Sequence, residues 1–415
     1  MAASVPTLDT IDIIGPDHYA RDGYPHDAWA LLRREAPVYW WDRDVKVPFW
    51  AITKHADVVE ISKQPKKHRN GPRLAVFPAF APPREDERVI RHLLVMDPPE
   101  HAHYRRLTSA HFTPRAVERL HASVDVIARD VVDDLAKRGL EGEVDFVEAV
   151  SARLPLEVLA DLLGVPREDW QLMFRWTNAT IGADDPEYAE AGDPQQTFGG
   201  AQTALFEYFW KMVEARRAAP RDDIVSVLAN ASLDGQPVKP MELLSYCFLL
   251  VVAGNETTRN ATSGGLVALI ENPGELQKLR DRPELLDTAV EEILRWTSPV
   301  IQFCRTATEA FTLRGQRIRA GEAMCLFYPS ANRDEEVFGD SMTFRVDRQP
   351  NPHLAFGIGE HFCLGAHLAR LELRALLRHL IPRLLDVSLT GPVERLRSSF
   401  VGGVKHVPIR YRLAS

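Results

Sequence analysis

Apolar residues recur at helical spacing through most of the chain. This pattern predicts helices over residues 26–36, 54–64, 100–112, 114–138, 155–180, 201–219, 240–270, 275–285 and 366–385. Alternating stretches at 37–53, 304–328 and 396–413 predict small hairpins. Strands and helices do not alternate regularly, which argues against a doubly wound fold. We therefore expect a mainly helical protein with small β-sheets.

Two long stretches lack either periodicity, residues 66–98 and 329–365. The first is rich in proline and glycine, yet it carries Leu74, Val76, Phe77 and Phe80, which need a surface to pack against. An irregular segment of that length inside a compact protein is often a binding loop. No linker or internal repeat separates these stretches from the rest. We expect one domain spanning residues 1–415.

Composition and charge narrow the class of protein. The chain is 45% hydrophobic and 26% charged, as in ordinary globular proteins. A formal charge of −8, with scattered basic residues, predicts no nucleic-acid partner. The longest apolar stretch, 243–254, is too short to span a bilayer, so no membrane anchor is expected. The N-terminus lacks a signal-peptide pattern, which predicts a cytoplasmic protein.

The four cysteines are too few and too scattered for a disulfide framework. Cys247, Cys304 and Cys325 have apolar neighbours and are interpreted as small core residues. Cys363 differs, because it stands in a glycine-rich loop just before an amphipathic helix. A helix N-terminus favours a thiolate. Taken alone, this arrangement fits a reactive thiol or a core residue as well as a metal ligand.

The surrounding run is more specific. Phe356-Gly357-x-Gly359-x-His361-x-Cys363-Leu364-Gly365 resembles the haem-binding loop of the cytochrome P450 superfamily in its bacterial soluble form. The resemblance implies a helix-rich triangular prism, with haem b between a long distal helix and this loop. It implies that Cys363 ligates the iron. It also implies that Phe356 packs near the sulfur and that His361 contacts a haem propionate.

A second segment interrupts the long apolar helix predicted over 240–270. It reads Ala253-Gly254-Asn255-Glu256-Thr257-Thr258 and places a glycine mid-helix, which costs about 1 kcal/mol relative to alanine. An acid beside an alcohol can form a proton relay. The segment resembles the family's oxygen-activating motif, with glutamate where some members have aspartate. By that resemblance Thr257 delivers a proton to dioxygen and Glu256 resupplies it.

Two further sets of residues support the resemblance. Glu292 and Arg295 stand three apart in "EEILR" and could be an ordinary surface pair. In this chain order they resemble the family's structural ion pair, which Arg348 would complete. The other set consists of residues that match the family's contacts to the haem propionates: His101, Arg105, Arg305 and His353. Each of them alone would not identify a haem site.

The segments that match the family's substrate contacts are mostly apolar. They carry Leu74, Val76, Phe77, Phe80, Phe174, Val300, Ile301, Phe303, Phe400 and Val401. This content favours a fairly large hydrophobic substrate, although half of these residues could equally be core. Arg73 could meet a charged head group. The relatives that the chain resembles oxidise sterol side chains, terpenoids, fatty acyl groups or polyketides, and the sequence does not separate these classes.

The activity implied by the resemblance is a monooxygenase reaction that inserts one atom of O2 into the substrate. No flavin or iron–sulfur signature accompanies the haem region, so the electrons are expected from a separate ferredoxin and ferredoxin reductase. Basic residues that could bind an acidic ferredoxin, or be ordinary surface charge, are Arg105, Arg106, Arg370 and Arg374. The alternatives are a peroxide-driven haem-thiolate enzyme and a non-catalytic haem sensor. The Glu256–Thr257 pair argues against both.

Overall fold

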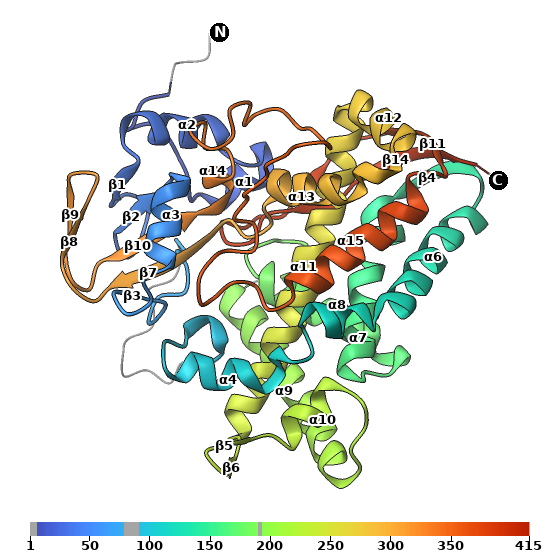
Figure 1. The fold of residues 1–415 in the computed structure, drawn as a ribbon, viewed down its shortest axis with the longest axis horizontal. Helices are drawn as coiled ribbons and strands as arrows, with labels where there is room; N and C mark the ends of the chain where they lie inside the picture. Colours follow the sequence, from blue (N-terminus) through green and yellow to red (C-terminus); the bar gives the residue numbers. More distant parts are fainter. Residues whose placement is uncertain (1–5, 79–90, 190–192, 415) are drawn as a thin grey trace.

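The structure is a computed structural model that describes residues 6–78, 91–189 and 193–414. Helices predominate over strands (Figure 1). Their bounds are α1 (Pro16–Asp22), α2 (His26–Glu35), α3 (His55–Ser62), α4 (Glu100–Ser109), α5 (Pro114–Glu118), α6 (His121–Lys137), α7 (Arg153–Leu163), α8 (Trp170–Ile181), α9 (Pro194–Ala218), α10 (Ile224–Ala229), α11 (Pro240–Glu271), α12 (Pro273–Asp281), α13 (Leu286–Thr297), α14 (Tyr328–Ala331) and α15 (Ala366–Leu380).

The strands form small sheets at the margins of the helical part. Five of them make a mixed sheet in the order β1-β2-β10-β7-β3, and three make a second sheet in the order β11-β14-β4. The strand bounds are β1 (Val38–Trp41), β2 (Phe49–Ile52), β3 (His68–Arg69), β4 (Glu141–Asp145), β5 (Ser232–Leu233), β6 (Gln236–Pro237), β7 (Gln302–Ala307), β8 (Phe311–Leu313), β9 (Gln316–Ile318), β10 (Ala323–Phe327), β11 (Leu384–Leu389), β12 (Glu394–Arg395), β13 (Val404–His406) and β14 (Pro408–Leu413). The predicted fold class, mainly helical with small sheets, is confirmed.

The 32-residue helix α11 passes through the middle of the molecule, between the five-stranded sheet and the α6–α7 side (Figure 1). It begins with Pro240 at its first helical position, where the missing N–H has no partner to lose. Most of its residues from Leu243 to Leu269 are buried. A helix surrounded by protein is apolar on all sides, which explains why the sequence pattern here is almost continuous rather than striped. No described helix has the length and apolarity that a membrane crossing requires.

Local signals explain where the structure departs from the predicted helices. The helix expected over 155–180 is two helices, because Gly164 ends α7 in a left-handed conformation (φ +72°). The helix expected over 114–138 is also two helices, α5 and α6. Asp193 caps the backbone N–H of Gln195, so α9 begins earlier than residue 201.

A buried ionic network fixes α13 to the irregular segment before Cys363. Arg295 donates from Nε and Nη2 to the two carboxylate oxygens of Glu292, at 2.7 Å each. Arg348 donates from Nε to Glu292 Oε2 at 3.0 Å. The side chains of Glu292 and Arg295 are both 0% exposed, which excludes the surface-pair interpretation. The structure thus brings together the three residues predicted to brace the cysteine loop.

Replacing Glu292 with alanine leaves two guanidinium groups in the interior without their shared carboxylate. We expect the free energy of unfolding to fall by about 3–5 kcal/mol, the usual loss when one partner of a buried pair is removed. Urea unfolding followed by circular dichroism measures the change. Glu284→Ala is the control, because Glu284 pairs with Arg282 on the surface and should shift stability by less than about 0.5 kcal/mol. Equal losses in the two variants would contradict a structural role for the network.

Candidate active site

An apolar cavity lies between the middle of α11 and the loop that carries Cys363. Its volume, counted as the space open to the centre of a water molecule, is about 230 Å³. On the same measure one bound water needs only roughly 10–15 Å³. The cavity therefore has room for a ligand. Of the residues predicted to hold haem or to activate oxygen, eleven line it: His101, Arg105, Ala253, Gly254, Thr257, Arg305, Phe356, Gly357, His361, Cys363 and Gly365.

The backbone of the cysteine loop holds the thiol at one wall of this cavity. The N–H of Cys363 donates to the carbonyl oxygen of Phe356 at 3.0 Å, which closes the loop on itself. Gly359 has φ +81°, and a Cβ there would lie 2.5 Å from the carbonyl oxygen of Ser62, so a larger residue does not fit. A Cβ on Gly365, just before α15, would meet no atom within 4 Å. Gly365 therefore forms part of the cavity wall beside the sulfur and leaves that wall without a side chain.

Electrostatics at Cys363 differ in part from the expectation of a lowered pKa. Burial raises the pKa of the Cys363 thiol, and this effect outweighs the lowering by the backbone N–H of Gly365 and the charges of Arg105 and Arg370. The expected contribution of the helix start is present, but it is smaller than the desolvation of the sulfur. A cation at the sulfur would reverse this balance, because metal ligation removes the thiol proton outright.

The opposite wall is the middle of α11. Ala253, Gly254 and Thr257 all line the cavity, as expected for residues that share one helix face. The Thr257 hydroxyl donates to the carbonyl oxygen of Ala253 at 2.8 Å. A Cβ on Gly254 would lie 3.3 Å from the side chain of Leu159, so the glycine permits close packing of α7 on α11. At this wall the helix therefore contributes the hydroxyl group of Thr257 and, at Gly254, backbone without a side chain.

Glu256 does not line the cavity, although the next residue does. Its side chain is 1% exposed and forms an ion pair with Arg259 on the same helix. Arg259 also donates to Asn178 Oδ1 at 2.8 Å, which ties α11 to α8. Burial raises the pKa of Glu256, against the opposing effects of Arg259 and Asn260. The acid and the alcohol of the predicted relay thus stand side by side in sequence, but only the alcohol reaches the cavity.

One edge of the cavity collects nitrogen donors that the protein leaves incompletely paired. The ring centroids of His101 and His361 lie 4.0 Å apart, with the two ring planes tilted by 37°. The buried Nε2 atom of each ring has no hydrogen-bond partner among the described residues. Arg105 and Arg305 also line this cavity, and their hydrogen bonds go to backbone carbonyl oxygens. Burial and the charges nearby lower the pKa of His361 to about 2. This donor set fits the two carboxylates of a haem, with a thiol available for the iron.

His353 departs from its expected role. It is not among the residues that line the cavity. Its Nε2 lies 2.9 Å from a carboxylate oxygen of Glu291, and its Nδ1 accepts the backbone N–H of Ala355 at 3.2 Å. Both ring nitrogens are therefore used within the protein. The structure therefore places His353 in contact with Glu291 and the backbone of Ala355, outside the lining of the cavity.

The predicted substrate contacts divide into cavity and core. Val300 and Phe303 line the cavity. Phe400 packs against Phe303 and Phe77 packs against Phe400, at 5.5 and 5.3 Å, so both stand behind this wall. The remaining described candidates are not cavity residues: Leu74, Val76, Phe174, Ile301 and Val401. Phe80 lies outside the described residues. Arg73 is buried and donates to the carbonyl oxygens of Val47 and Pro48. It is therefore not placed to bind a charged head group of a substrate.

Some cavity residues were not predicted. Most are apolar, as on α11 (Leu249 and Leu250), and cannot be told from core residues in a sequence. Glu372 is the exception, because it is a carboxyl group on α15 that is 3% exposed and lines the cavity. Its Oε2 has no partner among the described residues, and burial raises its pKa to about 8. Glu372 lies on the apolar face of α15, so helical spacing could have predicted that it points inward.

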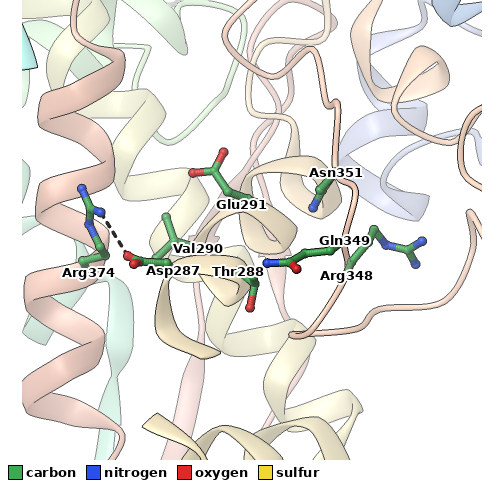
Figure 2. A pocket seen from close by; sticks show the side chains of 8 residues that line it. All are labelled: Asp287, Thr288, Val290, Glu291, Arg348, Gln349, Asn351 and Arg374. Carbon is green, nitrogen blue, oxygen red and sulfur yellow. Dashed lines mark hydrogen bonds and ion pairs between the residues drawn. The ribbon is translucent and has the colours of Figure 1, made fainter. Parts of the chain in front are cut away.

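Two polar clusters outside the cavity bear on other expectations. Figure 2 shows a surface groove between α13 and α15, where Arg374 Nη1 lies 3.0 Å from an oxygen of Asp287. Arg370 pairs with Glu291 at 2.6 Å. Two of the four cations expected to attract an acidic partner are therefore already compensated. Arg106 is exposed.

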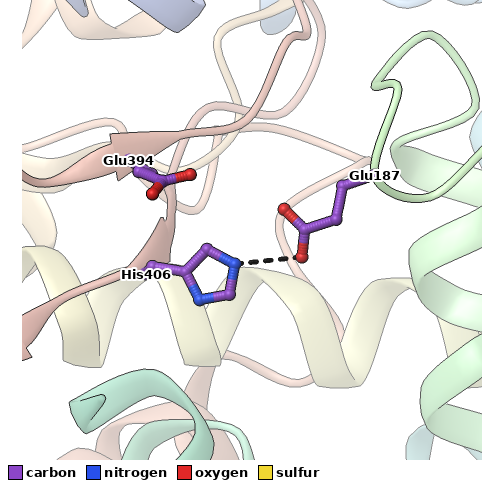
Figure 3. Close-up of side chains that lie close together, drawn as sticks. All are labelled: Glu187, Glu394 and His406. Carbon is purple, nitrogen blue, oxygen red and sulfur yellow. Dashed lines mark hydrogen bonds and ion pairs between the residues drawn. The ribbon is translucent and has the colours of Figure 1, made fainter. Parts of the chain in front are cut away.

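Among the described residues, Glu187, Glu394 and His406 come nearest to a metal-ligand arrangement, with ligand atoms within 4.8 Å of one another (Figure 3). However, His406 has carboxylates at both ring nitrogens, Asp145 at 2.5 Å and Glu187 at 3.0 Å. Although burial opposes it, these two carboxylates raise the pKa of His406. A ring that donates from both nitrogens has no lone pair for a metal. The cluster is an ion-pair contact of the C-terminal strands.

Comparison with known proteins gives the class. The Cytochrome P450 family model matches residues 192–385. The chain is 36% identical to Cytochrome P450-terp of a Pseudomonas species across 99% of both proteins. It is 40% identical to the Steroid C26-monooxygenase of Mycobacterium tuberculosis, over 96% of this chain and 92% of that protein. The structure of a Mycobacterium marinum cytochrome P450 in complex with pseudoionone aligns with a TM-score of 0.89, at 36% identity over 98% of this chain and all of the other.

The chain therefore belongs to the cytochrome P450 family. It is a haem-thiolate monooxygenase that uses O2 to oxidise hydrophobic substrates, as the family match and its hydroxylating relatives establish.

Glu372 generates a prediction about stability and pH. Its pKa of about 8 in the folded protein is far above the unfolded value, so between about pH 5 and 8 the folded chain keeps a proton that the unfolded chain releases. The free energy of unfolding of the wild type should therefore fall as pH rises through this window. Glu372→Gln should flatten that fall, measured by urea unfolding across the same range.

Glu372→Leu is the matched control, because it removes the same proton without adding an amide. It should flatten the pH dependence as much as Glu372→Gln does. If both variants keep the wild-type slope, Glu372 is ionised in the folded protein at neutral pH.

Proposed function

We propose that the cavity holds haem b, with the Cys363 thiolate as the protein ligand of its iron. The observation that carries this proposal is that Cys363, the face of α11 with Thr257, and an edge of unpaired nitrogen donors all line one apolar cavity. Arg105, Arg305, His101 and His361 would bind the two propionates. Phe356, Gly357 and Gly365 would pack around the sulfur. When bound, a thiolate-ligated haem favours cleavage of the O–O bond of dioxygen. The whole chain acts as one haem domain.

Thr257 presents a proton to the cavity at Oγ1. Its O–H donates to the carbonyl oxygen of Ala253, one helical turn back, and rotation about the Cβ–Oγ1 bond would redirect the hydrogen away from that oxygen. Glu256 is the acid that would resupply this proton: burial raises its pKa, and its Oε2 atom has no hydrogen-bond partner among the described residues. Since its carboxyl group points to Arg259, transfer to Thr257 needs a bridging water or a side-chain rotation.

The substrate is a neutral, largely hydrocarbon molecule. Val300, Phe303, Leu249 and Leu250 supply apolar walls. Arg73, the cation that could have met a charged head group, is buried and donates to two backbone carbonyl oxygens. Relatives named for a steroid and for methyl-branched lipids, and the neighbour bound to pseudoionone, favour a sterol side chain, a terpenoid or a branched lipid over a polar substrate.

The electrons come from a separate ferredoxin and its reductase. Phe362, next to Cys363, is 37% exposed, and Arg105 donates to its carbonyl oxygen at 2.7 Å. Arg106 lies exposed on the same helix as Arg105. An exposed aromatic residue beside the sulfur, with a cation nearby that has no ion-pair partner in the described part of the chain, fits the docking of an acidic protein. Arg370 and Arg374 contribute less, since acidic residues already compensate them.

The haem and substrate proposals are tested optically. Carbon monoxide added to the reduced protein should give the strongly red-shifted Soret band of thiolate ligation, and Cys363→His should abolish that band while the protein still takes up haem. A matched pair of ligands with one hydrocarbon skeleton, an alcohol and the corresponding carboxylic acid, is then titrated for the low- to high-spin shift. The alcohol should bind at least about tenfold more tightly, since an unpaired carboxylate is costly to bury. Tighter binding of the acid would contradict a neutral substrate.

The relay is tested with Thr257→Val, which removes the hydroxyl and keeps the branched shape. With ferredoxin, reductase and NADPH, we expect product per NADPH consumed to fall at least about tenfold, since a positioned proton donor typically contributes a factor of 10² or more. Thr262→Val is the control, because its hydroxyl makes the same 2.8 Å bond to the carbonyl four residues back but does not line the cavity. Unchanged coupling in Thr257→Val, or turnover with peroxide alone at the ferredoxin-supported rate, would favour the peroxide-driven alternative.

A further inference from the structure

Two of the free cysteines face each other across neighbouring strands. Cys304 on β7 is the direct antiparallel partner of Cys325 on β10 (Figure 1 labels both strands). The ladder bonds on either side join residue 328 to 301 and residue 307 to 322. Bonded positions alternate along an antiparallel pair. Counting from either bond, the cysteines occupy a non-hydrogen-bonded position.

A second observation confirms this position. The backbone N–H of Cys304 donates to the carbonyl oxygen of Leu74 at 2.8 Å, on the side of β7 away from β10. In such non-hydrogen-bonded pairs the Cα atoms approach to about 4.5 Å, and the side chains lie closer than at the bonded positions. A disulfide needs Cα atoms roughly 4.4–6.8 Å apart. The backbone therefore already holds these two thiols at a separation that a disulfide can span.

The surroundings favour ionisation at one of the two sulfurs. Arg73 is buried, and its described hydrogen bonds go only to the carbonyl oxygens of Val47 and Pro48, so its charge lacks a carboxylate partner there. Burial opposes ionisation of Cys304, but the Cys325 thiol and the charges of Arg73 and Arg305 outweigh it and lower the pKa of Cys304.

Cys247 provides the contrast. It is equally buried and has no cysteine opposite it, and burial raises its pKa to about 12. A buried thiol of that kind is inert, whereas a thiol with a lowered pKa beside a cation is the kind that reacts. Apolar surroundings therefore do not make these cysteines equivalent, although their sequence neighbours look alike.

We propose that Cys304 and Cys325 form a redox-active dithiol, which hydrogen peroxide converts into a cross-strand disulfide. The site takes a small neutral peroxide, because the sulfurs are 1% and 0% exposed and no larger oxidant can reach them without opening the sheet. This proposal concerns the protein's response to peroxide and is independent of the substrate assigned above.

The chemistry balances in two steps. The Cys304 thiolate attacks one oxygen of hydrogen peroxide, the O–O bond breaks, and the departing hydroxide takes a proton to become water. Cys304 is then a sulfenic acid. The Cys325 sulfur displaces its hydroxyl group, which leaves with the Cys325 proton as a second water, and the S–S bond forms. Two thiols lose two electrons and two protons, and one peroxide gains them.

The bond would alter a wall of the haem cavity. Cβ atoms at a non-hydrogen-bonded position lie about 4.5 Å apart, at the upper end of the disulfide range, and a disulfide holds them on average near 3.8 Å, so β7 and β10 would move slightly closer. Cys304 stands between Phe303 and Arg305, and both of these residues line the cavity. Oxidation of the pair would therefore shift an apolar wall residue and a candidate propionate ligand at once.

The test uses the ferric holoenzyme, without substrate or electron donor. It is treated with increasing hydrogen peroxide, quenched, alkylated in denaturant and digested with trypsin. Cleavage after arginine separates the peptides 296–305 and 320–333, which carry the two cysteines. We expect the two peptides to be joined, at a mass two hydrogens below their sum, with loss of two of the four alkylatable thiols. Cys247 should remain alkylated throughout.

Variants separate this reaction from general oxidation. Cys325→Ser should give no joined peptide and should leave Cys304 as a sulfenic acid that dimedone traps, while Cys247→Ser should form the joined peptide as the wild type does. A parallel peroxide treatment of ferric enzyme saturated with imidazole, which blocks the reaction of peroxide with the haem iron, excludes oxidation by the haem itself, since it should also yield the joined peptide. The proposal is overturned if both cysteines stay alkylatable at peroxide levels that bleach the haem, or if either is converted to a sulfinic acid without a joined product.

Discussion

The part of the molecule that carries the cysteine loop depends on the hydrogen bonds accepted by the carboxylate of Glu292. This carboxylate accepts hydrogen bonds from two guanidinium groups, from the backbone N–H of Arg345 and from the amide of Asn351. Burying three charges is costly, and it is tolerated only when the remaining donors and acceptors are also satisfied. Here they largely are, because Arg295 donates further to the carbonyl oxygens of residues 332, 341 and 343. The network does more to position a segment than to add stability.

That positioning extends to the sulfur. Asn332, whose carbonyl oxygen accepts from Arg295, uses its side chain to bond Ser298 Oγ and the backbone N–H of Leu354. The carbonyl oxygen of Leu354 then accepts from the N–H of Gly357 at the start of the cysteine loop. An irregular segment without helix or sheet is thus held by side chains that α13 anchors. This explains why a ligand loop can be rigid although it has no secondary structure of its own.

Much of this arrangement could be predicted from the sequence, because the residues concerned form contiguous motifs. The glycines around Cys363, the alcohol on α11 and the Glu292–Arg295 spacing are local patterns, and the structure places each where the pattern implied. The failures concern side-chain direction. Glu256 and Thr257 are adjacent, yet helical geometry points only Thr257 into the cavity. His353 is near the loop in sequence, but it pairs with Glu291.

The substrate walls were the least predictable part, for a related reason. Val76 and Ile301 are as apolar as Val300, and only tertiary packing decides which of them faces the cavity. Glu372 was missed because a charged side chain is normally expected at the surface, although its helical spacing places it on the apolar face of α15. The α7–α8 break was missed because helical spacing continues across Gly164 in the sequence although the backbone does not.

The cavity walls also determine when during folding the cavity comes into existence. They come from residues as far apart in the chain as Asn70 and Leu373, and α4, α11 and α15 all contribute. Contacts of such long sequence range form late, since the chain must first close the intervening loops. A partly folded chain therefore has no place for the prosthetic group. Haem that binds only the completed fold pulls the folding equilibrium toward it, so haem uptake marks the end of chain maturation.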